Sequence, residues 1–366
     1  MREYQTKIIT SDEGLEHLRS DWDRIHQSSL RATPFNSWAW MATWWQVYRR
    51  RHWQLHVVCV VSGDGIVGIV PLYVQSSWHG RTLRFLGTGE PEEDEVVTEY
   101  CDVLADPQFE AKVLLAAWQS LGDDDWSSFH TWNLLADSLV ARAAADSVWR
   151  RPCGVRYRMT LPATWDAFLA TCSANMRRQI RTATRDAAKA EASEAVFTDW
   201  NDGGAEAFEA LCVLHQSRWE GKDAPGAFAS TAFCDFHREI IRQHAVATGS
   251  EIRLIRSHGE PLAALYNFRL RDTVYFYQSG VSPDAHFRSP GVFSHARAIM
   301  SAIDDGIAFY DMMRGDVTSY KRRFPCEITG MESVSVYRSS ARAHLVRQRQ
   351  KLYEWLHSSV MSKQKN

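Results

Sequence analysis

The spacing of apolar residues in the first part of the chain predicts helices followed by strands. Leu15, Leu18, Trp22 and Ile25 recur on one face of a helix within residues 12–30. A tryptophan-rich helix is expected next, from Trp38 to Tyr48. Alternating and continuous apolar runs then predict further elements: strands at 55–61, 66–74, 81–86, 100–104 and 129–135, and a helix at 109–121.

The rest of the chain repeats this order of elements. The pattern predicts a strand at 156–161, helices at 164–192, 205–220 and 231–247, strands at 251–257, 261–269 and 273–280, a helix at 290–305, and strands at 308–313 and 331–337. The recurrence indicates an α+β fold with a mixed sheet, built from two related units. We expect units at 1–152 and 153–340, and a terminal amphipathic helix and tail at 341–366.

Composition narrows the class of protein. Of 366 residues, 45% are hydrophobic and 23% charged, as in ordinary globular proteins. The fifteen tryptophans indicate large buried cores or aromatic-lined pockets. A net charge of −2 argues against bulk binding of nucleic acid, DNA included, but permits local basic patches. The seven scattered cysteines include no Cys-x-x-Cys pair, no metal-ligand spacing is evident, and no apolar run is long enough for a membrane helix. We therefore expect a cytoplasmic protein without a metal or integral membrane association.

The densest group of chemically active residues follows the apolar run that ends near Met313. Arg314, Gly315 and Asp316 form a tight turn, and Tyr320 and Lys321 follow within one short loop. A hydrophobic core has no need of this mixture of acid, base and phenol. The loop is therefore a candidate active site, with a surface turn carrying incidental charges as the alternative.

A second candidate is the loop before the helix expected at 290–305. Ser289 and Pro290 suit the N-cap and first turn of a helix, and Arg288 precedes them. Free backbone N–H groups and the helix dipole favour an anion at such an N-terminus. The capping pattern alone does not distinguish a phosphate site from an ordinary capped helix.

Two further features could contact ligands. Arg177, Arg181, Arg185 and Lys189 lie four residues apart and form a basic stripe, which is either a solvated face or a surface for an acidic ligand. Trp219 and Lys222 flank the end of a helix before a flexible turn, where they could cover a substrate. His295 lies one turn beyond the candidate phosphate loop and could face a ligand.

Several motifs together resemble the CelD-like (BioF-like) branch of the GNAT acyltransferase superfamily. Trp22 with the run 34–40 resembles its N-terminal signature, and the run 175–181 resembles its Asn-x-Arg-Arg helix. The turn at 259–264, the loop at 289–291, and the run 310–316 with Tyr320 and Lys321 resemble its remaining motifs. The resemblance covers nearly the whole chain. It implies two tandem GNAT-like domains in the architecture of the Fem transferases.

The resemblance implies acyl transfer from a thioester, acetyl-CoA or another acyl-CoA, to an amine or hydroxyl. The acceptor would be a small molecule or a glycan- or lipid-linked group, in polysaccharide, envelope or natural-product biosynthesis. In GNAT folds a splayed strand pair holds the pantetheine, and the next loop and helix N-terminus hold the pyrophosphate. The cofactor contacts expected here are Arg288, Ser289, Gly291, Val292, Phe293, Arg314 and Arg178.

Roles for the charged loop follow from direct attack of the acceptor on the thioester. A carboxylate, Asp316 or alternatively Asp311, would take the proton of the acceptor. Tyr320 would protonate the leaving thiolate, and Lys321 with Arg314 would stabilise negative charge or hold phosphate. Substrate contacts are expected from Trp219, Lys222, Tyr277 and His295.

Two other functions are compatible with the same motifs. Fem peptidyltransferases share the double architecture but use aminoacyl-tRNA, and the basic stripe would fit an RNA backbone as well as a CoA phosphate. A non-catalytic binding protein with a GNAT fold is the third reading. The charged loop at 314–321 retains its acid, base and phenol, which argues against a protein that has lost catalytic activity.

Overall fold

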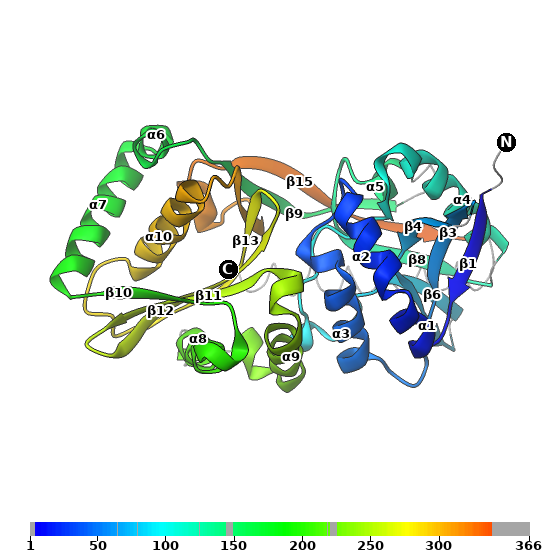
Figure 1. Ribbon diagram of the computed structural model, residues 1–366, viewed down its shortest axis with the longest axis horizontal. Coiled ribbons are helices and arrows are strands. Elements are labelled where there is room, and N and C mark those ends of the chain that lie inside the picture. Colours follow the sequence, from blue (N-terminus) through cyan, green and yellow to red (C-terminus); the bar gives the residue numbers. More distant parts are fainter. Residues whose placement is uncertain are drawn as a thin grey trace, which may run out of the picture.

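A computed structural model describes residues 4–63, 65–78, 80–123, 125–143, 149–217, 219 and 225–338. The predicted terminal helix and tail, and Lys222, lie outside the described residues. Figure 1 shows two lobes, which we call the N-terminal half (residues 4–143) and the C-terminal half (residues 149–338). No helix among the described residues is long and apolar enough to cross a membrane.

The N-terminal half places its helices early and its strands in the middle. Its elements are β1 (Gln5–Ile9), α1 (Asp12–His17), α2 (Arg19–Ser28), α3 (Trp38–Tyr48), β2 (Trp53–Leu55), β3 (Val57–Ser62), β4 (Gly65–Val70), β5 (Leu72–Ser77), β6 (Gly80–Phe85), β7 (Leu104–Ala105), α4 (Glu110–Asp123), β8 (Ser128–Leu135) and α5 (Leu139–Ala143).

The C-terminal half follows the order expected from the sequence except that one expected helix is divided and a strand, β10 (Ser193–Phe197), is added after it. Its elements are β9 (Trp149–Thr160), α6 (Trp165–Thr171), α7 (Ala174–Lys189), β10 (Ser193–Phe197), α8 (Ala205–Ser217), α9 (Thr231–Thr248), β11 (Ser250–Ser257), β12 (Glu260–Leu270), β13 (Thr273–Val281), α10 (Pro290–Asp304), β14 (Phe309–Gly315) and β15 (Glu327–Tyr337).

One large mixed sheet joins the two halves. Its eleven described strands run in the order β10-β11-β12-β13-β14-β9-β15-β8-β6-β5-β2, and a separate sheet has the order β1-β3-β4-β7. β15 pairs with β9 on one side and with β8 on the other, so β9 and β15 run together from lobe to lobe (Figure 1). The expected division at 152/153 falls inside β9, and the domain boundaries remain a prediction.

Several expected elements are wrong in detail. The helix expected within 12–30 is two helices, α1 and α2, and the strands expected at 55–61 and 66–74 are each divided between the two sheets. The helix expected at 164–192 is two helices, because Cys172 is extended and Ser173 begins α7 by accepting a hydrogen bond from the Met176 N–H at 3.2 Å. The strand expected at 100–104 shrinks to β7. Tyr100 has φ of 61°, which is incompatible with an extended strand, and its N–H bonds to the Asn133 carbonyl.

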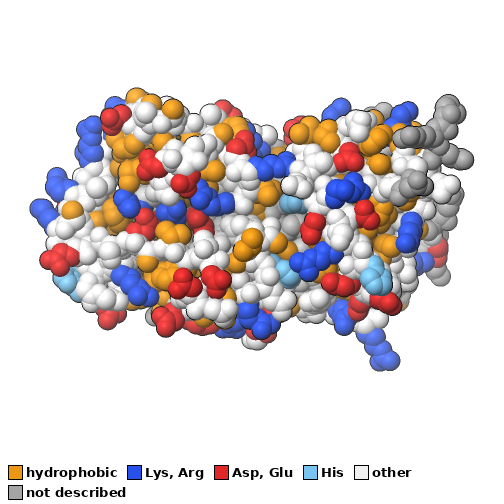
Figure 2. Space-filling model, viewed as in Figure 1, with side chains coloured by type: hydrophobic (Ala, Val, Ile, Leu, Met, Phe, Trp, Pro, Cys, Tyr) orange, Lys and Arg blue, Asp and Glu red, His pale blue; other side chains and the backbone are white. Residues whose placement is uncertain are grey.

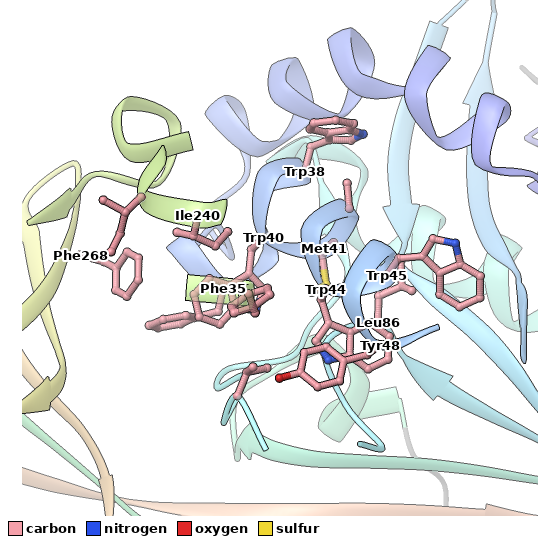
Figure 3. Packing of buried hydrophobic residues seen from close by; sticks show 14 of the residues in the cluster. Phe35, Trp38, Trp40, Met41, Trp44, Trp45, Tyr48, Leu86, Ile240 and Phe268 are labelled. Atoms are coloured by element: carbon pink, nitrogen blue, oxygen red, sulfur yellow. The ribbon is translucent and has the colours of Figure 1, made fainter. Parts of the chain in front are cut away.

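An aromatic core packs the halves against each other. In Figure 3, Phe35 and Trp40 extend from the N-terminal half toward Ile240 and Phe268 of the C-terminal half. The ring centroid of Trp40 lies 4.8 Å from that of Phe236 and 5.5 Å from that of Phe268, both edge to face. The abundant tryptophans therefore do form a large buried core. On the surface, acidic and basic side chains are mixed over the face seen in Figure 2.

The feature that positions the candidate site is a fork between β13 and β14. The two strands pair in parallel from Thr273–Phe309 to Tyr275–Asp311, and no pairing continues beyond that point. β14 then bulges against β9 between Asp311 and Arg314, where Met313 has φ of 60°. From Phe276 onward, β13 therefore has β12 on one side and an open edge toward β14.

Candidate active site

A cavity of about 560 Å³ fills the mouth of this fork. Both strands, the loop after β14 and the N-terminal half contribute to its lining: Val97, Glu99, Cys153, Gly154, His215, Trp219, Phe276, Tyr277, Gln278, Ser279, Met313, Arg314, Gly315, Asp316, Tyr320 and Lys321. We call it the fork cavity. It brings together six residues expected from the sequence, which are Asp316, Tyr320, Lys321, Arg314, Trp219 and Tyr277.

One group in the lining, the buried carboxyl group of Glu99, was not expected from the sequence. Its side chain is only 3% exposed, and its two oxygens accept from the Arg314 backbone N–H at 3.1 and 2.8 Å. Burial raises the pKa of the Glu99 carboxyl to about 7, although the Lys321 charge and the Arg314 N–H oppose the rise. Glu99 can therefore exchange a proton near neutral pH.

Lys321 holds the bulge of β14 in place. Its Nζ donates to the carbonyl oxygens of Met312 and Arg314 at 2.5 and 2.6 Å, and lies 5.8 Å from the ring centroid of Phe276. Burial lowers the pKa of the Lys321 ammonium, while the Glu99 and Asp311 carboxylates raise it. An ammonium has three N–H donors, so one more hydrogen bond can be made to a group in the cavity.

A chain of hydrogen bonds anchors the loop that carries Glu99. The Tyr277 hydroxyl donates to the Val96 carbonyl at 2.5 Å and lies 3.0 Å from Nε2 of His237. Burial lowers the pKa of His237 well below its ordinary value, which keeps the ring neutral. The Glu90 carboxyl accepts from the Val96 N–H at 3.0 Å. Tyr277 thus lines the cavity, while its hydroxyl serves to position the loop.

Asp316 and Tyr320 lie at the outer rim of the cavity. Asp316 is exposed, and its Oδ1 accepts from the backbone N–H and the hydroxyl of Thr318, as in an Asx-turn. This turn leads into the short helix η6 (Tyr320–Arg323). The Tyr320 ring is 42% exposed and faces the cavity beside Lys321. Arg314 is fixed through Nη1, which donates to the Cys153 carbonyl at 2.7 Å.

Asp311, the alternative base, is fully buried behind the fork. Its Oδ1 accepts from the Tyr100 hydroxyl at 3.0 Å and the Met313 N–H at 2.7 Å, and its Oδ2 is paired with Arg156 Nε at 2.7 Å. Asp311 does not line the fork cavity. Its contacts indicate that it holds the bulge rather than meets a substrate.

The residues expected to bind a cofactor lie at the start of α10. Ser289 occupies the N-cap with φ of 57°, and its side chain makes no capping hydrogen bond. Arg288 and Ser289 are exposed, whereas Phe293 is buried. Gly291 lies beside Val281, two residues past Ser279 of the cavity lining. The N-terminus of α10, with Val292 in its first turn, is thus adjacent to the open end of the fork.

The remaining expected residues are more dispersed. His295 is buried with Nδ1 3.1 Å from the Tyr310 hydroxyl, and burial, with the Lys321 charge, lowers its pKa to about 3. It lies behind the cavity wall and contributes a neutral ring. Arg178 is exposed on α7 and donates to Asn175 at 2.7 Å. Among the described residues no cluster of His, Cys, Asp or Glu could hold a metal ion.

Comparison with known proteins bears on the fold of the chain. Residues 174–322 match the family model described as an acetyltransferase (GNAT) domain. No curated protein matches the chain. Many solved structures share its fold, and three of them do so over almost their whole length at low sequence identity.

FemX is 9% identical, with a TM-score of 0.60 over 96% of this chain and 99% of FemX. The C-terminal domain (DUF2156) of a protein from Agrobacterium fabrum, named as a lysylphosphatidylglycerol synthetase, is 11% identical, with a TM-score of 0.55 over 93% of this chain and 97% of that one. L-PGS from Bacillus licheniformis is 10% identical, with a TM-score of 0.51 over 92% of this chain and 95% of that one.

These findings confirm the expected fold class. The chain has a mixed α/β architecture with one large mixed sheet and shares its fold with FemX, and residues 174–322, which make up most of its C-terminal half, match the acetyltransferase (GNAT) domain model. The charged loop and most of the lining of the fork cavity lie within residues 174–322. Four lining residues lie outside this range: Val97 and Glu99 in the N-terminal half, and Cys153 and Gly154 in β9.

Proposed function

We propose that this protein transfers an acyl group from acyl-CoA to an amine or hydroxyl acceptor in the fork cavity. The observation that carries the proposal is a buried carboxyl group with a pKa of about 7 beside a lysine, in a cavity between two splayed strands. Perturbed acids and bases in a concave site are typical of catalysis. The matched acetyltransferase domain supports acyl transfer as the reaction class.

The open strand edges and the start of α10 suit the two parts of the donor. The pantetheine arm has amide groups that can pair with the free edge of β13 at residues 276–279. The N-terminus of α10, which has no side-chain cap, offers backbone N–H groups to the pyrophosphate. Arg288, exposed beside it, supplies a positive charge.

The reaction needs a base, a charge stabiliser and an acid. Glu99 takes the proton of the acceptor as its nitrogen or oxygen bonds to the thioester carbon. Lys321 stabilises the negative charge that develops on the carbonyl oxygen. The C–S bond then breaks, and Tyr320 donates its proton to the departing sulfur. Glu99 takes the role first expected of Asp316 because it is buried, and because Asp316 is engaged in a turn.

Release of CoA thiol from acetyl-CoA and longer acyl-CoAs, measured with a panel of amines and alcohols, tests the proposal. We expect acceptor-dependent thiol release that is lost in Lys321→Ala. Absence of thiol release with every acceptor, together with absence of acyl-CoA binding, would reject acyl-CoA as the donor.

A donor of the aminoacyl-tRNA type is the second candidate. One observation favours it: three of the four residues of the expected basic stripe, Arg181, Arg185 and Lys189, are exposed along α7. The fourth, Arg177, is half-buried and donates to the Cys172 carbonyl. Under that alternative, tRNA binds with strong salt dependence, and a triple alanine variant of the stripe weakens it. Salt-independent or absent tRNA binding would leave acyl-CoA as the donor.

A further inference from the structure

A second cavity, of about 270 Å³, lies between the two halves at the opposite end of β13 and β14 from the fork. We propose that this cavity binds a small anion carrying carboxylate or phosphate groups. It shares no lining residue with the fork cavity. Four arginines line it, and they come from both halves: Arg31, Arg156, Arg158 and Arg271.

Arg158 is the strongest single indication. Its guanidinium carbon lies 3.6 Å from the ring centroid of Phe309, which also lines the cavity. No described carboxylate forms an ion pair with it. A half-buried guanidinium presents a planar set of N–H donors that matches a carboxylate or phosphate. Stacking on Phe309 holds that set in one orientation.

Arg271 likewise forms no ion pair with a carboxylate of the described residues. Its guanidinium donates to the carbonyl oxygens of Ser29, His26 and Gln27 at 2.9, 3.0 and 2.6 Å. These carbonyls lie at the C-terminal end of α2, so the bonds fix the guanidinium at the cavity wall. Its positive charge adds to the field within the cavity.

Two hydrogen-bonding atoms of the wall are buried without a hydrogen-bond partner. They are Oγ1 of Thr33, a residue that is 9% exposed, and Nε of Arg31. The Arg31 Nε lies 3.5 Å from a Glu110 oxygen, which is an ion pair but too long for a good hydrogen bond. Buried polar groups left in this state are costly, and an anion in the cavity would satisfy such donors.

The acidic residues of the lining do not cancel this preference. Asp102 accepts from the backbone N–H groups of Val103, Leu139 and Val140, so both its oxygens are engaged. Asp272 accepts from the Thr273 hydroxyl at 3.1 Å. Asp137 is 75% exposed and lies 3.7 Å from Arg31. The fourth arginine, Arg156, is paired with Asp311 behind the wall.

The volume limits the size of the ligand. A water molecule occupies about 30 Å³ in the liquid, so the cavity has room for several non-hydrogen atoms. Inorganic phosphate and a short dicarboxylate such as succinate both fit this description. Phosphate carries its charge on one group, whereas succinate carries it on two separated carboxylates. Separate titrations show which of the two the cavity binds.

Calorimetric titration of the whole protein with sodium phosphate and with sodium succinate, in a chloride buffer of low ionic strength, tests the proposal. We expect one-site binding of at least one of them, weakened about tenfold or more in Arg158→Ala and in Arg158→Gln. Arg51→Ala, which removes an exposed arginine that does not line the cavity, should bind as the wild type does. Thermal unfolding of each variant verifies that it is folded.

A Lys321→Ala variant separates this site from the fork cavity and should retain the binding. If neither anion binds at millimolar concentrations, the proposal is wrong. It is also wrong if the Arg158 variants bind like the wild type, or if Lys321→Ala alone loses binding, because the anion would then occupy the fork cavity.

Discussion

Glu99 carries the proton transfer in the proposed reaction, and its environment makes that role measurable. Because its pKa is about 7, the base is protonated at lower pH, and kcat/KM should fall as the pH drops through about 7. Glu99→Gln should lower kcat by about 10²–10⁴-fold and remove this acidic limb. Measurement of kcat/KM against pH for the wild type and for Glu99→Gln tests whether Glu99 is the base.

Asp316→Asn is the matched control, since it alters the other carboxyl group of the cavity. It weakens the turn at Thr318 and should leave the pH profile in place. If Asp316→Asn lost the fall in kcat/KM at low pH while Glu99→Gln kept it, Asp316 rather than Glu99 would be the base.

The same group should also affect stability. The raised pKa means that the folded state favours protonated Glu99, so its stabilising effect is complete below about pH 4.5 and is lost as the pH rises through about 7. Glu99→Gln should therefore increase the free energy of unfolding at pH 8 by on the order of 2–3 kcal/mol. At pH 4 the wild type and Glu99→Gln should unfold at the same urea concentration. If their urea midpoints were also equal at pH 8, burial would not raise the pKa of Glu99 as described.

At the residue scale, the sequence reveals the charged loop but not its partner. Tyr320, Lys321 and Asp316 are close in sequence, so a local motif finds them. Glu99 follows an acidic run that is typical of a solvated loop, and no spacing rule relates it to residues two hundred positions later. A long-range contact, that with the Arg314 N–H, defines it as a site residue.

The proposed donor binding depends on the fork between β13 and β14, and Gly280 lies on β13 directly after the strand residues that line the fork cavity. A Cβ at Gly280 would lie 2.6 Å from the His215 backbone nitrogen and from the Leu214 Cβ, so α8 packs directly on β13. Gly280→Ala should push α8 away, lower the free energy of unfolding by about 1–3 kcal/mol and weaken acyl-CoA binding. Urea denaturation and calorimetry measure the two effects.

Gly330→Ala provides the comparison, because nothing lies within 4 Å of a Cβ at that strand position. It should leave both the stability and the donor affinity close to those of the wild type. Equal behaviour of the two variants would show that the approach of α8 to β13 does not set the geometry of the fork.

Helices and buried strands of the C-terminal half are predictable because their apolar periodicity is strong. The prediction fails where a local cap or a positive φ interrupts the pattern, as at Ser173 and Tyr100. β1 and β10 were missed altogether. Both lie at sheet edges and are largely exposed or half-buried, which removes the hydrophobic signal on which strand prediction depends.

At the scale of the whole molecule, β9, β15 and the aromatic core tie the halves into one structure. β15 pairs with strands of both halves, and Trp40 packs on Phe236 across the junction. We therefore expect a single unfolding transition in urea, with coincident midpoints for tryptophan fluorescence and far-ultraviolet circular dichroism. Two separate transitions would support independent units divided near residue 152.

Titration of the protein with acetyl-CoA and a longer acyl-CoA by calorimetry tests the central claim most directly. The account predicts micromolar one-site binding, weakened about tenfold in Arg288→Ala and in Lys321→Ala, and unchanged in Arg51→Ala. Absence of binding, or equal affinity in all four proteins, would contradict acyl-CoA as the donor held by the fork and the start of α10.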